Sequence, residues 1–233
     1  MPEDRSLFHY GAIYHMLLDP LITPARRAIV EYIPPSSKVL DIGCGTGQLC
    51  FELSREKHCQ VMGIDLSRRM LDFAEKHNRY ASVEFRHMDA SHMPDIDSDS
   101  FDYVVMSYII HELYRDSQLQ LLSEAWRVGR HVLMLDSNAP LPRNPFGIAK
   151  RIVEYIFGRD HFAQFRAYLA SGGIGGILDD AQLPSTMLTA ANDLAISEYG
   201  ILDDAQLRST IVYDKVFSAS SLRLVVLGHN DVA

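Results

Sequence analysis

The sequence predicts an α/β protein in which helices cover both faces of a mainly parallel β-sheet. Along most of the 233 residues, segments with strand spacing alternate with segments with helical spacing, which is typical of such a sheet. The chain ends differently, because two apolar strands over 211–217 and 222–227 are joined by a short serine-rich connection. A parallel crossover needs about a dozen residues or more, so these two strands are predicted to form an antiparallel hairpin.

The first strand, residues 38–42, runs directly into three glycines at alternate positions, Gly43, Gly45 and Gly47. Glycine permits sharp turns at positive φ and lets a ligand lie against bare peptide groups, and the helix predicted to follow offers unpaired N–H groups at its start. A dinucleotide-binding loop, G-x-G-x-x-G, would require its third glycine where Gln48 stands. The loop is therefore predicted to bind a ligand other than a pyrophosphate.

A second strand is predicted over residues 61–66, and it carries Asp65 at its end. Asp65 follows Asp41 at about the distance, roughly 20 residues, at which an acidic residue binds ribose hydroxyls in nucleotide-binding βαβ units. Ser67 is placed to cap the next helix. A glycine turn without a ligand would not predict an acid here, so the two features together favour a nucleotide-like ligand.

Further strands and helices continue the alternation. A third strand begins near Val83, and a polar acidic turn over 95–100 leads into residues 101–107. That run is almost continuously apolar, as expected of a central strand buried on both faces. A helix over 117–126 and a strand over 132–135 complete the parallel part of the predicted sheet.

The composition fits one soluble globular domain. The net charge of −8 and the isoelectric point near 5.6 argue against nucleic acid as a partner, because such binders usually carry a basic stripe. No apolar stretch approaches the roughly 18 residues of a membrane span, and the first residues do not resemble a secretory leader, so we expect a cytoplasmic protein without a membrane span. The three cysteines form no C-x-x-C pair, so neither a disulfide nor a metal site is expected.

Residues 41–47 match the pattern D-x-G-x-G-x-G and resemble motif I of the class I S-adenosylmethionine-dependent methyltransferases. The resemblance extends from about Tyr10 to Gly228 and is closest to the small-molecule branch typified by ubiquinone and menaquinone biosynthesis. It implies a single methyltransferase domain over 1–233 with a Rossmann-like seven-stranded sheet, mostly parallel with an antiparallel last strand and helices on both faces. It also implies S-adenosyl-L-methionine as cofactor and methyl transfer to a small-molecule acceptor by in-line displacement.

The resemblance implies cofactor contacts around the first two strands. Gly43 and Gly45 would lie against the methionine part of the cofactor. Asp65 would bind the ribose hydroxyls, with Leu66 beside the adenine.

Further contacts are implied beyond the second strand. Asp89 and Ala90 match the motif that contacts the adenine edge, although a solvated carboxylate and a small turn residue are the alternatives. Ser107 matches a position whose backbone lies near the methionyl group. Tyr14, with Tyr10 second, would close over the cofactor as the aromatic residue of the N-terminal helix; the alternative is a core aromatic.

Catalytic chemistry is harder to place than binding. The sulfonium methyl group is already activated, so holding a nucleophile in line and excluding water can suffice. His111, beyond the fourth strand, could take a proton near neutral pH; alternatively it is only a hydrogen-bonded or capping side chain. His111 and Glu112 do not form the zinc motif H-E-x-x-H, because residue 115 is an arginine.

Residues 138–173 are predicted to form a substrate cap. Pro145 can open a helix with an apolar side, and aromatic residues interleaved with arginines follow it. One interpretation is a cover over the sheet edge that admits an apolar or aromatic acceptor. The other is an amphipathic helical pair with a solvated basic face.

A short segment of the chain is duplicated. Residues 176–186 recur as 200–210 with one difference, Pro184 against Arg208. Because the second copy continues directly into the terminal strand, we predict that it fills the helix position before the hairpin and that residues 177–200 are an insertion. Local packing, extension of the cap and contacts in a homo-oligomer are open roles for this insertion.

Two other classes of function share part of the pattern. A nicotinamide-dependent oxidoreductase has the same strand, loop and acid, but Gln48 and the antiparallel ending argue against it. A catalytically silent module would bind S-adenosylmethionine and transfer no methyl group. Titration with each cofactor and an acceptor screen separate the three.

Overall fold

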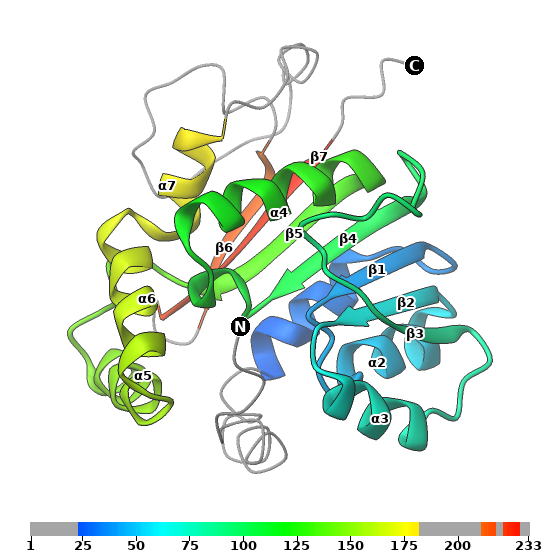
Figure 1. Ribbon diagram of the computed structural model, residues 1–233, viewed down its shortest axis with the longest axis horizontal. Coiled ribbons are helices and arrows are strands. Elements are labelled where there is room, and N and C mark those ends of the chain that lie inside the picture. The colour runs from blue at the N-terminus through cyan, green and yellow to red at the C-terminus, as the bar shows by residue number, and fades with distance from the viewer. Residues whose placement is uncertain (1–22, 182–210, 218–220, 229–233) are drawn as a thin grey trace.

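The computed structural model describes residues 23–181, 211–217 and 221–228, and its seven strands form one sheet (Figure 1). In space the strands follow the order β3-β2-β1-β4-β5-β7-β6. Their bounds are β1 Lys38–Ile42, β2 Gln60–Asp65, β3 Val83–His87, β4 Phe101–Ser107, β5 Gly129–Ser137, β6 Ile211–Phe217 and β7 Leu222–Gly228.

The direction of the strands confirms the predicted fold class. β1 to β5 pair in parallel, whereas β7 is antiparallel to both β5 and β6. The last strand therefore lies between β5 and β6 and is the one that runs against the other six. The terminal hairpin predicted from its short connection is present as β6 and β7.

Both faces of the sheet are buried. Successive side chains of a strand point to opposite faces, so Leu40 and Ile42 join one apolar cluster while Val39 joins the other. In the same way Met106 and Val105 lie on opposite sides of β4. This explains why the central strands are almost continuously apolar in sequence.

One face is covered by the N-terminal helices. A helix over residues 23–32, α2 (Gln48–Lys57) and α3 (Arg68–His77) contribute Ile29 and Leu53 among others to one cluster. Their apolar stripes face the sheet and their polar residues face solvent.

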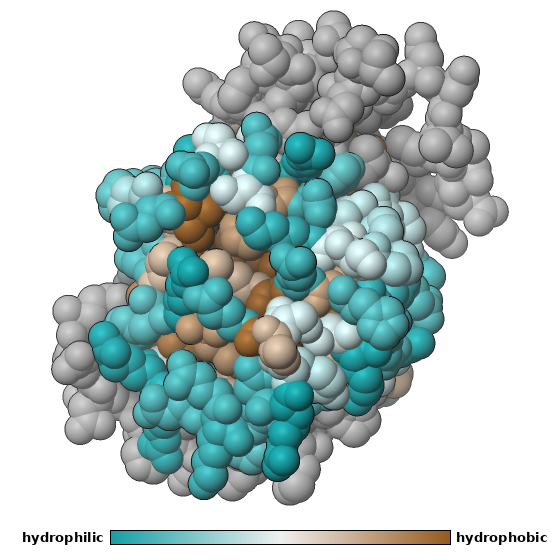
Figure 2. Space-filling model, turned by 90° about the vertical axis from the view of Figure 1, so that its right-hand side faces the viewer, coloured by the Kyte–Doolittle hydropathy of each residue, from teal (hydrophilic) through white to brown (hydrophobic). Residues whose placement is uncertain are grey.

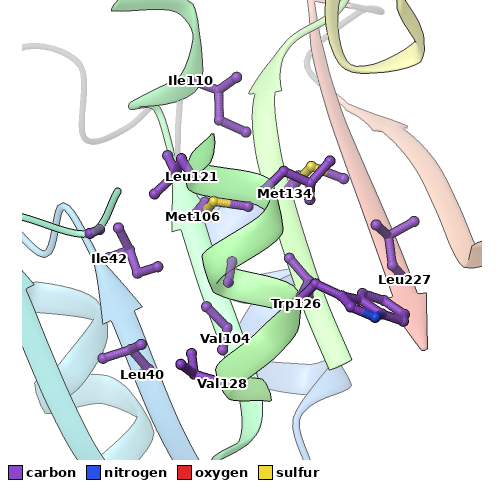
Figure 3. Close-up of a cluster of buried hydrophobic side chains, with 14 of the residues drawn as sticks. Leu40, Ile42, Val104, Met106, Ile110, Leu121, Trp126, Val128, Met134 and Leu227 are labelled. Carbon is purple, nitrogen blue, oxygen red and sulfur yellow. The ribbon is translucent and has the colours of Figure 1, made fainter. Parts of the chain in front are cut away.

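The opposite face is covered by α4 (Arg115–Val128) and α7 (Gly173–Asp180). Leu121 and Trp126 of α4 meet the side chains of β1, β4, β5 and β7 in a continuous cluster (Figure 3). Trp126 is the single tryptophan of the chain and is buried.

The predicted cap region contains two helices, α5 (Pro145–Ile156) and α6 (Arg159–Ala170), which lie together at one end of the molecule beyond β5 (Figure 1). Pro145 opens α5 as expected, and the Asn144 Oδ1 accepts a hydrogen bond of 3.0 Å from the backbone N–H of Gly147. α6 packs against the short 3₁₀ helix η2 (Ile110–Glu112).

The apolar side of α5 is exposed in the described part of the chain. Its large apolar residues are between 45% and 66% exposed, namely Phe146, Ile148, Ile152, Tyr155 and Ile156. Whether this helix covers an acceptor stays a prediction.

The start of the first copy of the duplicated segment, residues 176–180, lies in α7 and packs in the core, whereas an insertion was expected to lie on the surface; whether residues 177–200 are an insertion stays a prediction. Ile177 and Leu178 are each 1% exposed and belong to the cluster beneath α4. The physical reason is that two consecutive apolar side chains follow a glycine-rich turn that brings them onto the core. Residues 182–210, with the second copy, lie outside the described residues.

The surface on the side of α3 and β3 is hydrophilic around a central apolar area (Figure 2). Scattered apolar exposure is normal, whereas a gathered area indicates a place where something can bind. No described helix combines the length and the apolar character that crossing a membrane would require.

Candidate functional site

The glycine loop between β1 and α2 has the backbone geometry that only glycine adopts without strain. Gly43, Gly45 and Gly47 have φ of 69°, 52° and 77°, all in the left-handed region. A Cβ atom at Gly43 would lie 2.4 Å from Ile109 Cγ2, and one at Gly47 would lie 2.6 Å from Phe85 Cζ. The loop therefore needs glycine both for its turns and for the close approach of neighbouring side chains.

The carboxylate of Asp65 ties this loop to the end of β2. Its Oδ2 accepts a hydrogen bond of 2.9 Å from the Gly45 N–H, and its Oδ1 accepts one of 2.8 Å from the Ser67 N–H. Two predicted cofactor residues, Gly45 and Asp65, are thus in direct contact. They meet at the carboxyl edge of the parallel strands, where ligands of open α/β sheets bind.

The predicted adenine contacts lie beyond this point. Leu66 is 60% exposed, and its carbonyl oxygen lies 2.9 Å from His87 Nε2. Asp89 is exposed and accepts hydrogen bonds from the N–H and the hydroxyl of Ser91 at 2.9 and 2.7 Å. Ala90 is buried in the core, so its side chain also has a packing role.

The end of β4 turns sharply beside the loop. Ser107 is half-buried, and Tyr108 has a φ of 60°, an uncommon value for a residue other than glycine. The Tyr108 N–H donates to the Leu135 carbonyl at 2.9 Å, which holds the turn against β5. Tyr14 and Tyr10 lie outside the described residues.

His111 follows this turn and is 1% exposed. Its Nδ1 lies 2.7 Å from Asp136 Oδ1, and its backbone N–H donates to Oδ2 of the same carboxylate at 3.2 Å. The ring of Phe165 meets the imidazole edge to face at 5.5 Å between centroids. Burial alone lowers the pKa of His111, but the carboxylates of Asp136 and Glu154 outweigh it and raise that pKa to about 10.

Glu154 of α5 reaches the same place and is completely buried. Its Oε2 lies 3.6 Å from His111 Nε2 and in close contact with His161 Nε2 of α6, while Lys150 Nζ lies 2.5 Å from Oε1. Burial alone raises the pKa of Glu154, but Lys150 and the two histidines outweigh it and hold that pKa well below its usual range.

The sequence did not indicate that Glu154, His161 and Lys150 belong with His111. Each stands on an amphipathic helix where a charged residue is expected to face solvent. Glu154 and His161 lie on either side of the turn between α5 and α6, which is compatible with a shared site. Only the fold shows that both point to η2.

Comparisons with known proteins agree on one family. Residues 39–131 match the family model described as a methyltransferase domain. A demethylmenaquinone methyltransferase from Lysinibacillus sphaericus is 30% identical over 145 residues, which is 58% of this chain and 61% of that protein. A ubiquinone/menaquinone biosynthesis C-methyltransferase from Desulfotalea psychrophila is 31% identical over 121 residues, covering 49% of this chain and 48% of that one. The fold resembles an S-adenosylmethionine-dependent methyltransferase from Aquifex aeolicus, with a TM-score of 0.57, 17% identity and coverage of 94% and 98% of the two chains.

The chain has the fold of the class I methyltransferases, and its residues 39–131 match a methyltransferase domain. S-adenosylmethionine is the cofactor of that class, and the site residues present fit it, because bare peptide groups and a strand-end carboxylate adjoin at the sheet edge. The chain spans about half to three fifths of the length of these two curated relatives.

The first acid of the methyltransferase motif, Asp41, is buried. It is 1% exposed, its Oδ2 accepts a hydrogen bond from the Cys50 thiol at 3.3 Å, and its Oδ1 has no partner among the described residues. Burial raises the pKa of Asp41 to about 7, with a further contribution from the charge of Asp65. The motif predicted the position of this residue, and the structure adds its isolation from water.

Proposed function

We propose that the protein transfers the methyl group of S-adenosylmethionine to a small-molecule acceptor by in-line displacement. The observation that carries the proposal is the contact between Asp65 and Gly45 at the carboxyl edge of the sheet, within the matched methyltransferase domain. In-line transfer requires no covalent enzyme intermediate, only alignment of a nucleophile with the activated methyl group and removal of water.

For the cofactor, we propose contacts along the edge from β1 to β4. Gly43, Gly45 and the backbone at Ser107 would hold the methionine part, and Asp65 would accept hydrogen bonds from the ribose hydroxyls. This is supported by the carboxylate lying between two backbone N–H groups, which fixes its orientation. The adenine would lie against the exposed side chain of Leu66, with the remaining contacts from Asp89 and Ala90 and the aromatic cover from Tyr14.

For the acceptor, we propose an apolar or aromatic small molecule approached from the side of α5 and α6. The rings around His111 and the exposed apolar face of α5 support this choice. His111 is the candidate catalytic residue. Without a bound metal ion, its imidazole carries two protons at neutral pH, because the pKa of His111 is about 10; in that state it would stabilise developing negative charge before it could accept a proton.

Calorimetry with S-adenosylmethionine, S-adenosylhomocysteine and NAD tests the cofactor assignment. We expect the first two to bind and NAD not to bind. Asp65→Ala should weaken binding of S-adenosylmethionine by about 5- to 150-fold, because hydrogen bonds to a charged group are worth about 1–3 kcal/mol. Asp72→Asn on the exposed face of α3 is the matched control. Binding of NAD alone would refute the proposal.

An acceptor screen separates the enzyme from a silent binding module. Phenolic, quinone-like and carboxylic compounds are offered with S-adenosylmethionine, and release of S-adenosylhomocysteine is measured. A protein that binds the cofactor and releases none of the product with any acceptor is the silent module.

A cytoplasmic location and a homo-oligomeric state also stay predictions.

A further inference from the structure

Three potential metal ligands converge at one end of the described fold. They are His111, Glu154 and His161, each of which offers one ligand atom, and these atoms all lie within 4.8 Å of one another. The Nε2 atoms of both histidines face Glu154 Oε2. They come from η2, α5 and α6, so the fold rather than the local sequence brings them together. Among the described residues, no other group of this kind occurs.

The first histidine is prepared as a ligand. Asp136 holds the Nδ1 side of the His111 ring at 2.7 Å and also accepts from its backbone N–H. Metal-binding histidines typically donate the other ring N–H to a carboxylate in this way, which fixes the ring and raises its basicity. The Nε2 atom is then directed at Glu154, 3.6 Å away.

The burial of the Glu154 carboxylate costs free energy that an acid at the surface would not lose. Glu154 and His111 are both about 1% exposed in their side chains, and His161 is 20% exposed. Moving a carboxylate out of water costs several kcal/mol unless strong partners compensate. Lys150 supplies one partner on Oε1, while the two imidazole nitrogens share Oε2.

We infer that His111, Glu154 and His161 bind a divalent transition-metal ion such as Zn²⁺, Fe²⁺ or Co²⁺. Two imidazoles and one carboxylate are ligands that these ions accept, at about 2.0–2.2 Å from the metal. Tetrahedral ligands at that distance lie roughly 3.4 Å apart, close to the 3.6 Å between His111 Nε2 and Glu154 Oε2. The His161 ring, in direct contact with Oε2, moves outward to admit the ion.

Three protein ligands leave a coordination position open. His161 and Lys150 are the partly exposed members of the cluster, so we expect a small molecule to reach that position from their side. An acceptor oxygen bound there would lose its proton more easily, since a metal ion acts as a Lewis acid. This use of the ion rests on the proposed function; metal binding itself does not.

The rival interpretation is a closed ion-pair network. In it, Lys150 and a doubly protonated His111 neutralise Glu154 and Asp136, and no ion enters. The two interpretations differ in what removing the lysine does. If a metal binds, Lys150→Met removes a competing cation and binding is kept or tightened, whereas a closed network would only be destabilised and would still take up no metal.

Titration of the chelator-treated full chain, free of any histidine tag, with Co²⁺ and Zn²⁺ tests the inference. We expect one equivalent to bind, with visible d–d absorption from Co²⁺ that Zn²⁺ displaces. His161→Ala and Glu154→Gln should each weaken binding by at least about 10-fold, while His131→Ala, outside the cluster, should leave it unchanged. His161 is the main variant because its partial exposure makes misfolding the smaller risk.

Two results would overturn the inference: absence of a stoichiometric ion in wild type and in Lys150→Met, or full binding retained in both ligand variants. Calorimetry with S-adenosylmethionine on the same samples keeps the two proposals distinct. Loss of metal binding with normal cofactor binding refutes only the metal site, and the reverse pattern refutes only the methyltransferase assignment.

Discussion

Replacing Asp41 by asparagine should make the protein more stable above neutral pH, relative to wild type, than below it. The Asp41 carboxyl is 1% exposed and one of its oxygens has no hydrogen-bond partner among the described residues. Its folded-state pKa is raised from 3.8 to about 7 by burial. Asparagine has nearly the same shape and no charge, so Asp41→Asn removes the titration while keeping the packing.

The size and sign of the effect follow from linkage. A carboxyl whose pKa is raised on folding contributes stability that is fully present below its unfolded pKa of 3.8 and is lost as the pH rises through about 7. At about 1.4 kcal/mol per unit of pKa shift, the whole loss is about 4 kcal/mol. Between pH 5 and pH 8 the part that changes is about 2–3 kcal/mol.

The amide of the variant has its own cost. Leaving its N–H groups without partners costs about 1–3 kcal/mol, but this penalty does not vary with pH. The prediction therefore concerns the change in the stability difference between variant and wild type, rather than its value at one pH.

Urea unfolding without cofactor, followed through the buried fluorophore Trp126, measures this difference at several pH values. Coincident transitions by fluorescence and circular dichroism are needed before free energies are compared. Asp72→Asn, on the exposed face of α3, should show a flat difference. A flat difference for Asp41→Asn as well would mean that the Asp41 carboxyl is ionised in the folded protein at pH 5, and the reasoning from burial would be refuted.

Three further predictions concern the glycine loop, a buried hydrogen bond and the repeated segment. Gly47→Ala should lower stability by about 1–3 kcal/mol in thermal melting, because its φ is 77° and a Cβ would lie 2.6 Å from Phe85 Cζ; an unchanged melting temperature would contradict the loop geometry. Tyr168→Phe removes the 2.9 Å hydrogen bond to the Ser137 carbonyl and should cost about 1–2 kcal/mol in urea unfolding, whereas no change would show that water replaces the hydroxyl. Deleting residues 177–200 joins Gly176 to Ile201 and restores one copy of the repeat. The shortened chain should fold and melt cooperatively, because the second copy supplies the same apolar pair to the α7 position, and an insoluble product would show that the copies are not interchangeable.

The sheet and the contact between the glycine loop and Asp65 could be predicted because their signals are local. Strand periodicity, a run of glycines and an acid at a strand end are each visible within a few residues, and the Gly45–Asp65 contact follows from the parallel order of neighbouring strands. The terminal hairpin was predictable for the same reason, since the length of a connection limits its topology.

The surroundings of His111 could not be predicted in this way. Asp136, Glu154 and His161 come from three other elements. The sequence pattern does not show which charged residues of the helices after β5 face the interior of the protein. The two copies of the repeat are locally equivalent, so periodicity could not predict that Ile177 and Leu178 of the first copy pack in the core. Their burial depends on how the chain leaves α6, which is a tertiary property.

The hydrogen bonds from Gly45 and Ser67 to Asp65 have a consequence for affinity. They form in the protein alone, so the carboxylate is preorganised and little side-chain entropy remains to be lost when a ligand arrives. The Asp65 carboxylate is consequently a rigid part of the site rather than one that takes its position only when a ligand binds. Substitutions that weaken these hydrogen bonds, even where they do not touch the ligand, should mainly increase the rate at which the ligand dissociates. Most affinity differences among variants of one site lie in the dissociation rate.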